Sequence, residues 1–183
     1  DKICSLSGKK YGLMVNSGSS ALILALKVLD LPKNSEVITP CLNFGTALSS
    51  IILSDLRPIL VDCDKETLQI DINKLEKKIT KKTKALLIPN LIGNIPDWRK
   101  IRKVANKFNL KIIEDSADTL GAKINNIPTG YFSDISITSF YGSHIISCAG
   151  NGGIFLTNNV ISIWIGTPNN CLRLNRWPQA FCF

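Results

Sequence analysis

Residues 85–118, ALLIPNLIGNIPDWRKIRKVANKFNLKIIEDSAD, decide the fold class of this chain. The stretch opens with a continuous apolar run, Ala85–Pro89, which is typical of a strand buried on both faces. Residues 101–108 then repeat apolar side chains at helical spacing among lysines and arginines. A second apolar run follows at Lys111–Glu114. A strand, an amphipathic helix and a strand in this order predict a βαβ unit with parallel strands.

The same alternation continues on both sides of this unit. We predict further strands at Gly12–Val15, Glu36–Thr39, Pro58–Asp62, Ile135–Phe140 and Gly153–Thr157, and further helices at Ser19–Leu29, Phe44–Leu53 and Ile72–Thr80. The chain is therefore expected to be an α/β protein whose mostly parallel central sheet is covered by helices on both faces.

Composition bounds the class of protein. The 183 residues are 45% hydrophobic and 20% charged, which suits a globular chain with one sizeable core. The net charge of +8 comes mainly from Lys74–Lys84 and Arg99–Lys111. In the second segment Ile101, Val104 and Phe108 recur at helical spacing, so we expect the basic residues to form the wet faces of amphipathic helices. This pattern argues against a nucleic-acid partner.

The cysteines form no metal-binding or disulfide pattern. Six are scattered along the chain without a CxxC pair, at positions Cys4, Cys41, Cys63, Cys148, Cys171 and Cys182. Neither a charged-then-apolar leader nor a long apolar run is visible. These features predict a reduced cytoplasmic protein with no metal site and no membrane association.

Polar and glycine residues collect where the predicted strands end. In an open α/β sheet these ends border the ligand crevice, so loops distant in sequence converge there. The first such loop, Asn16–Ser20, opens a helix, and its free N–H groups and hydroxyls suit a phosphate. An ordinary serine N-cap explains the same residues. In the second loop, Pro40–Phe44, the aromatic Phe44 is either a core residue or a platform for a planar ring.

The third and fourth loops carry ionisable groups. Glu114–Asp118 contains three acids just beyond a strand, where a carboxylate could pair with a protonated heterocyclic nitrogen; a helix-capping cluster is the alternative. The fourth loop follows Ser139 and holds His144, the single histidine. The last lysine of the chain is Lys123. Chemistry in this loop must therefore use an imidazole rather than an amine.

Together these loops resemble a known family. The segments NSGSSALILAL, EVITP, PILVDCDKETLQID, TKALLIPNLIGN, IIEDSADTLGAK and SFYGSHIISCAGNGG are similar, in this order, to the large domain of the DegT/DnrJ family. This family comprises pyridoxal-phosphate enzymes of the fold type I aminotransferase architecture that act on nucleotide-linked sugars. The resemblance covers residues 1–159.

The resemblance implies a role for each candidate residue. Gly18, Ser19 and Ser139 would bind the cofactor phosphate, and Phe44 would stack on the pyridine ring. Asp115 would keep the pyridine nitrogen protonated, so that the ring remains an electron sink. Asp118 occupies a position near the ring hydroxyl where many members have glutamine or histidine.

His144 stands where most members of the family have the lysine that forms the Schiff base. The replacement is typical of the hexulose 3-dehydratase branch, in which free pyridoxamine phosphate condenses with a 4-keto sugar, the histidine removes a proton and the C3 hydroxyl leaves. The resemblance therefore implies a catalytic His144, pyridoxal or pyridoxamine 5'-phosphate as cofactor, and a nucleotide-linked 4-keto-6-deoxyhexose of deoxysugar or lipopolysaccharide biosynthesis as substrate. A sugar-nucleotide aminotransferase and a noncatalytic fragment that binds the cofactor or a partner chain are the alternatives.

The ends of the chain suggest a fragment. The family continues into a smaller C-terminal domain, whereas residues 160–183 read as an unrelated tail, so we expect a large domain at residues 1–159 that is also shortened at its N-terminus. Full-length members usually form homodimers, and some dehydratases use an iron-sulfur cluster and a reductase partner. The cysteines present here do not match such a cluster, which leaves that dependence open.

Overall fold

The computed structural model describes residues 1–160 and is built around one seven-stranded sheet. The strand order is β1-β9-β8-β5-β4-β2-β3. The strands are β1 (Tyr11–Val15), β2 (Glu36–Pro40), β3 (Arg57–Val61), β4 (Thr83–Pro89), β5 (Lys111–Asp115), β8 (Ile135–Ser139) and β9 (Gly153–Thr157). β9 pairs antiparallel with both β1 and β8, and the other pairings in this sheet are parallel. The predicted mostly parallel sheet is therefore confirmed.

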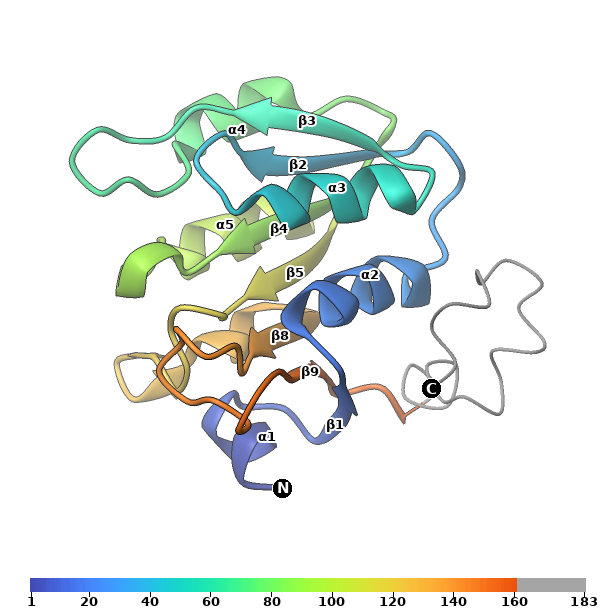
Figure 1. Ribbon diagram of the computed structural model, residues 1–183. Coiled ribbons are helices and arrows are strands. Elements are labelled where there is room, and N and C mark those ends of the chain that lie inside the picture. The colour runs from blue at the N-terminus through green and yellow to red at the C-terminus, as the bar shows by residue number, and fades with distance from the viewer. Residues whose placement is uncertain (161–183) are drawn as a thin grey trace.

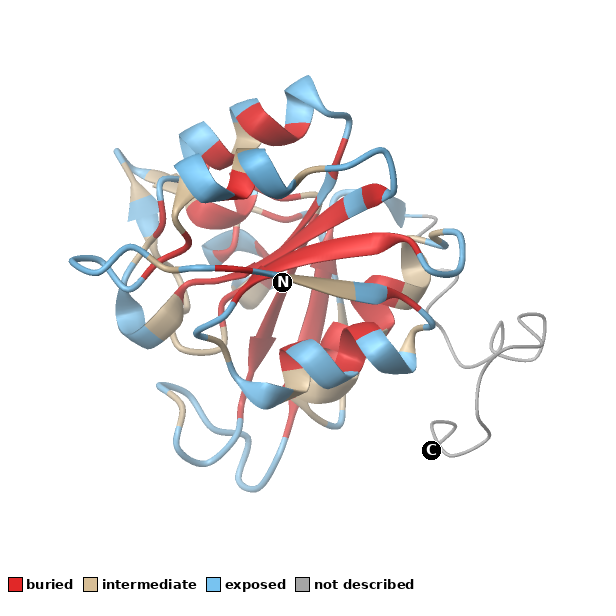
Figure 2. Cartoon of the chain, turned by 90° about the horizontal axis from the view of Figure 1, so that it is seen from above, coloured by how far each residue is buried: buried red, intermediate tan, exposed pale blue. Residues whose placement is uncertain are grey.

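Helices cover both faces of the sheet (Figure 1). α2 (Gly18–Val28) and α3 (Gly45–Leu53) pack on one face, and α4 (Ile72–Lys78) and α5 (Trp98–Lys107) pack on the other. Figure 2 shows the buried strands between these two layers. The α/β architecture with helices on both faces agrees with the sequence-based expectation.

Strand β4 explains why its sequence is apolar without alternation. Leu87 joins the core on the side of α2 and α3, whereas Leu86 and Ile88 join the core on the side of α5. All three side chains are fully buried. Burying one such side chain contributes about 1.5–3 kcal/mol, so both layers are held by the same strand.

Helix α5 ends earlier than its apolar pattern indicated. Ile101 and Val104 are buried as predicted, but Phe108 lies beyond the last helical residue and is 37% exposed. Its ring contacts the ammonium group of Lys107, 5.1 Å from the ring centroid. Leu110 enters the core in its place. The expectation for Phe108 was wrong because the helical spacing stops at Lys107.

Several short elements were not predicted. They are α1 (Lys2–Leu6), the 3-10 turns η1 (Leu91–Gly93) and η2 (Thr129–Phe132), and the hairpin of β6 (Lys123–Ile124) and β7 (Ile127–Pro128). The hairpin turns through Asn125 and Asn126, which both have positive φ, as a tight two-residue turn requires. Strands of two residues and helical segments of three to five residues, little more than one turn, are too short to produce a recognisable pattern.

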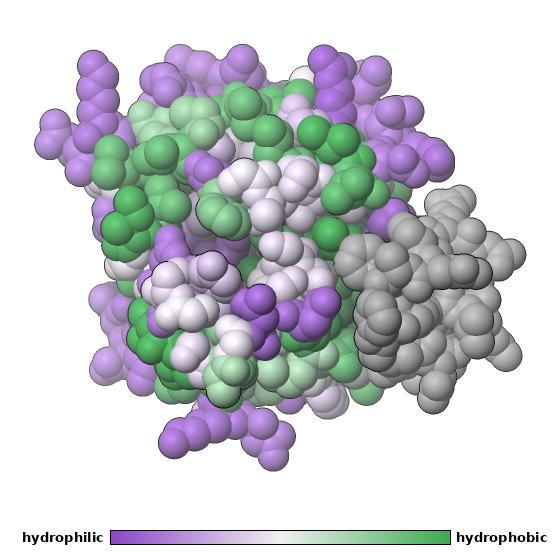
Figure 3. Space-filling model, viewed as in Figure 1, coloured by the Kyte–Doolittle hydropathy of each residue, from purple (hydrophilic) through white to green (hydrophobic). Residues whose placement is uncertain are grey.

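The surface spreads its charge over helices. Hydrophilic side chains gather at the margins of the face in Figure 3, and hydrophobic ones lie nearer its centre. On α4, Lys74 forms an ion pair with Asp62 at 2.7 Å.

Within residues 1–160 no helix has the length and apolar character needed to cross a bilayer. The same residues contain no cluster of potential metal ligands. The predicted tail, apart from Val160, lies outside the described residues.

Candidate cofactor site

The predicted site residues share one edge of the sheet. Strands β2, β3, β4, β5 and β8 are parallel, so their carboxyl ends lie together, at the left of Figure 1. β1 runs in the same direction because both β1 and β8 are antiparallel to β9. The candidate residues come from the loops that follow β1, β2, β5 and β8. Such an edge is where open α/β sheets bind their ligands.

The start of α2 packs directly against the end of β8. A Cβ added to Gly18 would lie 2.6 Å from Cβ of Ser139, so only glycine permits this approach. Ser17 caps the helix, because its Oγ accepts a hydrogen bond from the Ser20 N–H at 3.1 Å. The serine N-cap is thus present. The start of α2 and the end of β8, the two hydroxyl-bearing segments that the predicted phosphate site requires, also lie together. The N-terminus of an 11-residue helix beside Ser139 is suited to an anion.

Phe44 is not a core residue. Its side chain is 70% exposed, and it occupies the N-cap position of α3. Asn43 fixes the loop: its Oδ1 accepts from the Phe44 N–H at 2.7 Å, and its Nδ2 donates to Thr39 Oγ1 at 2.9 Å. A rigid loop that presents an exposed aromatic ring is suited to stacking on a planar ligand.

Asp115 ends β5 in a buried position, 6% exposed. Burial raises its pKa to about 6, and the nearby charges of Asp118 and Glu114 act in the same direction, while a hydrogen bond from the Ala117 N–H opposes them. That hydrogen bond, 3.0 Å long, reaches Oδ1 of Asp115. The residues that follow form turns rather than a helix, so the helix-capping alternative for this acidic loop is wrong.

His144 lies beside Asp118. Its Nδ1 is 3.5 Å from Oδ1 of Asp118, and the other carboxylate oxygen of Asp118 accepts a hydrogen bond from the Ile92 N–H at 3.1 Å. Ile92 itself has φ of 56°, a backbone conformation that is unfavourable for a β-branched residue. The ring of Tyr141 meets the imidazole edge to face, with centroids 6.1 Å apart. Asp118 therefore connects the loops that follow β4, β5 and β8.

The sequence analysis missed Asn90, which follows β4. Its side chain accepts from Trp98 Nε1 at 2.8 Å and donates to Glu114 Oε1 and Ser116 Oγ, both at 2.8 Å. Its own N–H donates to the carbonyl of Asp115 at 2.8 Å. A polar residue directly after an apolar strand was the signal that could have identified it. Glu114 belonged to the predicted acidic loop, but its buried contact with Asn90 could not be predicted, because the two residues come from different segments of the chain.

These residue types match the parts of a phosphorylated pyridine. A helix N-terminus with hydroxyl groups suits the phosphate, an exposed aromatic suits the ring face, and a buried carboxylate suits a protonated ring nitrogen. The close approach that Gly18 permits, and that a Cβ would block, fits a phosphate cradle at this point. The fold and the site thus define an α/β domain of the pyridoxal-phosphate-binding class.

Residues 1–162 match the DegT/DnrJ/EryC1/StrS aminotransferase family, and the chain belongs to this family. The family depends on pyridoxal or pyridoxamine phosphate, which agrees with the resemblance in the sequence. Its solved structures include both cofactor forms.

Curated relatives act on sugar nucleotides. The chain is 37% identical over 159 residues to GDP-perosamine synthase of Escherichia coli O157:H7, covering 87% of this chain and 43% of the relative. It is 33% identical over 179 residues to GDP-4-keto-6-deoxy-D-mannose 3-dehydratase of Yersinia pseudotuberculosis, covering 94% and 44% respectively. The chain therefore spans less than half of the length of these relatives.

Solved structures confirm the fold. The Escherichia coli GDP-4-keto-6-deoxy-D-mannose-3-dehydratase with bound hydrated pyridoxal phosphate superposes with a TM-score of 0.84 at 32% identity, covering 90% of this chain and 43% of that one. An aminotransferase from Psychrobacter cryohalolentis superposes with a TM-score of 0.85 at 30% identity, covering 90% and 42%. These similarities agree with the fold type I architecture that the sequence resembles.

Proposed function

We propose that this chain is the cofactor-binding domain of an enzyme that removes the C3 hydroxyl of a nucleotide-linked 4-keto-6-deoxyhexose. The observation that carries this proposal is His144, because it occupies the loop between β8 and β9 and the chain has no lysine after Lys123. The named 3-dehydratase relatives support the reaction class. On this proposal residues 1–159 form the large domain, and residues 160–183 do not belong to it.

The cofactor, when bound, would supply an electron sink for the carbanion next to its ring. Gly18, Ser19 and Ser139 would hold its phosphate at the N-terminus of α2. Phe44 would cover the ring, and Asp115 would meet the ring nitrogen. The raised pKa of Asp115 indicates a carboxyl group kept in a desolvated place, where a cationic partner would hold it in its charged form.

His144 would move the proton. If its Nδ1–H points at Asp118, Nε2 is left as the base. A base oriented by a carboxylate is the usual arrangement for proton transfer near neutral pH. Asp118 then acts on the imidazole, in addition to the position near the ring hydroxyl that the resemblance implies.

A sugar-nucleotide aminotransferase is the second candidate, supported by the GDP-perosamine synthase relatives. In that reading a residue other than a loop lysine serves the amino-group transfer. A noncatalytic fragment that binds cofactor or a partner chain is the third. A cytoplasmic homodimer, and for the dehydratase a reductase partner, belong to the first proposal.

Borohydride reduction separates these candidates. Imidazole offers no primary amine, so pyridoxal phosphate bound to the wild-type chain should leave no covalent label on the peptide of residues 139–153 after reduction. A His144→Lys variant should be labelled there, as mass spectrometry of the peptide would show. Lys9 is the control among the other lysines, because it lies under the sheet and should stay unlabelled.

Stoichiometric labelling of a single wild-type lysine would contradict the dehydratase reading and favour the aminotransferase. If pyridoxal phosphate does not bind either protein, the cofactor assignment itself fails.

A further inference from the structure

Glu114 is a buried carboxylate on the opposite face of β5 from Asp115. Successive side chains of a strand point to opposite faces, and Ile112 and Ile113 obey this rule by joining the cores on the two sides of the sheet. Glu114 is therefore on the face of Ile112, under α5 and η2, whereas Asp115 is on the face of α2. Its side chain is 1% exposed.

Hydroxyl and amide donors surround this carboxylate. Oε1 accepts from Asn90 Nδ2 at 2.8 Å and from Ser116 Oγ at 2.9 Å. Oε2 accepts from Ser136 Oγ at 2.6 Å and from Ser133 Oγ at 3.3 Å. Such donors replace the water that a buried charge loses. Without the Glu114 carboxylate, these donors would be buried unpaired, which costs free energy of folding.

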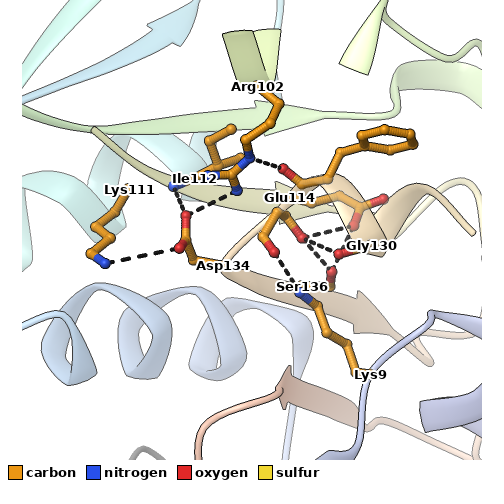
Figure 4. A network of polar contacts seen from close by, with 10 residues as sticks. Lys9, Arg102, Lys111, Ile112, Glu114, Gly130, Asp134 and Ser136 are labelled. Carbon is orange, nitrogen blue, oxygen red and sulfur yellow. Dashed lines mark hydrogen bonds and ion pairs between the residues drawn. The ribbon is translucent and has the colours of Figure 1, made fainter. Parts of the chain in front are cut away.

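Lys9 approaches the same cluster from the N-terminal segment. Its ammonium group donates to the Ser133 carbonyl at 2.7 Å, and the Ser133 hydroxyl donates to Glu114, so Ser133 connects Lys9 to Glu114. Figure 4 shows Lys9 reaching toward Glu114 and Ser136. Burial lowers the pKa of Lys9 to about 8, while the charges of Glu114 and Asp134 raise it and Arg102 lowers it. At neutral pH Lys9 is therefore mostly protonated, and it provides a positive charge close to Glu114.

Two neighbouring ion pairs make no hydrogen bond to Glu114, although their charges act on Lys9. In Figure 4, Arg102 and Lys111 contact Asp134 on the other side of the same segment. Arg102 Nε also donates to the Phe132 carbonyl at 2.7 Å. Asp134 thus has its own cations, whereas Lys9 reaches the Glu114 cluster through Ser133, whose carbonyl accepts from Lys9 and whose hydroxyl donates to Glu114.

The residues that bind Glu114 also fix the turn that follows Asp115. Asn90, which donates to Glu114, also donates its N–H to the Asp115 carbonyl at 2.8 Å. Ser116, the second partner of Glu114, donates its N–H to the Ile137 carbonyl at 2.9 Å. The peptide group that joins Asp115 to Ser116 is therefore fixed at its carbonyl by Asn90 and at its N–H by Ile137, and both Asn90 and Ser116 also bind Glu114.

We propose that Glu114 is a positioning residue for Asp115, holding it against the ring nitrogen of the cofactor through Asn90 and Ser116, with Lys9 as its buried counter-charge. The inference rests on the proposed function, because it gives Asp115 the role of partner to that nitrogen. Glu114 itself touches neither cofactor nor substrate.

The test is the titration of the Asp115 carboxyl group, followed by carbon NMR in the full chain and assigned with Asp115→Asn. Removing the Glu114 charge in Glu114→Gln should lower the pKa of Asp115 by about half a unit or more, because a like charge close to a carboxylate favours its neutral form. Glu114→Asp, which keeps the charge, should restore most of the wild-type titration.

Glu36→Gln is the matched control. Glu36 is also a buried strand glutamate held by hydroxyls, accepting from Thr80 at 2.5 Å and Thr83 at 3.2 Å, but it lies at the amino end of β2. Its substitution should cost stability and leave the Asp115 titration unchanged. If Glu114→Gln also leaves that titration unchanged, Glu114 is only structural and the inference is overturned.

A double-variant comparison tests the role of Lys9. Lys9→Met leaves the Glu114 charge without its cation. The double variant Lys9→Met/Glu114→Gln should therefore lose less in urea midpoint than the sum of the losses in the two single variants. Simple addition of the two losses would overturn the counter-charge assignment. Failure of pyridoxal phosphate to bind the wild-type chain would instead contradict the proposed function. The Asp115 titration and the urea comparison use the cofactor-free chain, so they would still decide whether Glu114 positions Asp115.

Discussion

Asp118 lies with one carboxylate oxygen 3.5 Å from Nδ1 of His144 and the other 3.1 Å from the backbone nitrogen of Ile92. The carboxylate is thus held by a backbone N–H on one side and faces the imidazole with the other. A hydrogen bond from Nδ1–H to Asp118 would select the Nδ1–H tautomer of His144 and leave Nε2 free of Asp118.

Asp118→Asn should disturb that tautomer. The amide is a weaker acceptor than the carboxylate, so the share of the Nε2–H form should rise in a nitrogen-correlated NMR spectrum of the imidazole. The chain has one histidine, which makes the signal unambiguous. In the complete enzyme we expect turnover to fall by about tenfold to a hundredfold while cofactor affinity changes little. An unchanged tautomer ratio would remove Asp118 from this role.

Asp115→Asn should stabilise the chain at neutral pH. The folded pKa of about 6 exceeds the value of about 3.9 for an unfolded aspartate, so folding favours the protonated form. The contribution to stability is complete below about pH 4 and is lost as the pH rises through 6, a difference of about 3 kcal/mol. Asparagine avoids this loss. Urea unfolding should show the variant more stable at pH 7 and close to wild type at pH 4. Equal stability of the variant and the wild type at pH 7 would show that burial does not disfavour the ionised Asp115 carboxylate.

Gly18→Ala should separate α2 from β8. The added methyl group would overlap Ser139, so we expect a loss of about 1–3 kcal/mol in the free energy of unfolding and weaker binding of pyridoxal phosphate. Gly45→Ala is the control, because the added Cβ at the start of α3 would meet no atom within 4 Å. That variant should be neutral or slightly more stable. Similar losses in both variants would argue against a close-packed phosphate cradle.

Phe44→Ala should separate binding from stability. The side chain is 70% exposed, so its loss should change the unfolding free energy by no more than about 0.5 kcal/mol. Loss of a stacking ring should nevertheless weaken pyridoxal phosphate binding by about tenfold, which fluorescence titration can measure. Tyr131→Ala, at a position that is 68% exposed in η2, serves as the control and should bind normally. Normal binding by Phe44→Ala would exclude the stacking role.

The sequence predicted the elements whose pattern is local. The run Ala85–Pro89 and the segment after it contain their own strand and helix signals, and these elements are confirmed. The position of β9 between β1 and β8 could not be read from the chain, because strand order depends on pairing between segments more than 130 residues apart. For Phe108 the periodic pattern continued past the physical end of the helix.

The candidate site was predictable only in part. Asp115 and His144 were identifiable because ionisable groups follow apolar strands, and the structure places both at the carboxyl edge. Their roles remain predictions. The contact between Asp118 and His144 was not predictable, since it depends on how two loops fold over one sheet edge. The acidic loop that includes Glu114 was recognised, but the link from Glu114 through Ser133 to Lys9 was not predictable, because it joins segments far apart in the sequence.

Strand β1 hydrogen-bonds to β9, the last strand of the described chain. During synthesis β1 therefore leaves the ribosome long before its partner exists, and its edge stays open until residues 153–157 emerge. The proposed phosphate site also depends on β9, because Gly153 packs against the carbonyl of Ser17 just before Gly18. On the proposed function, β9 completes the cofactor site, and we expect no cofactor capture by the nascent chain until residues 153–157 have left the ribosome.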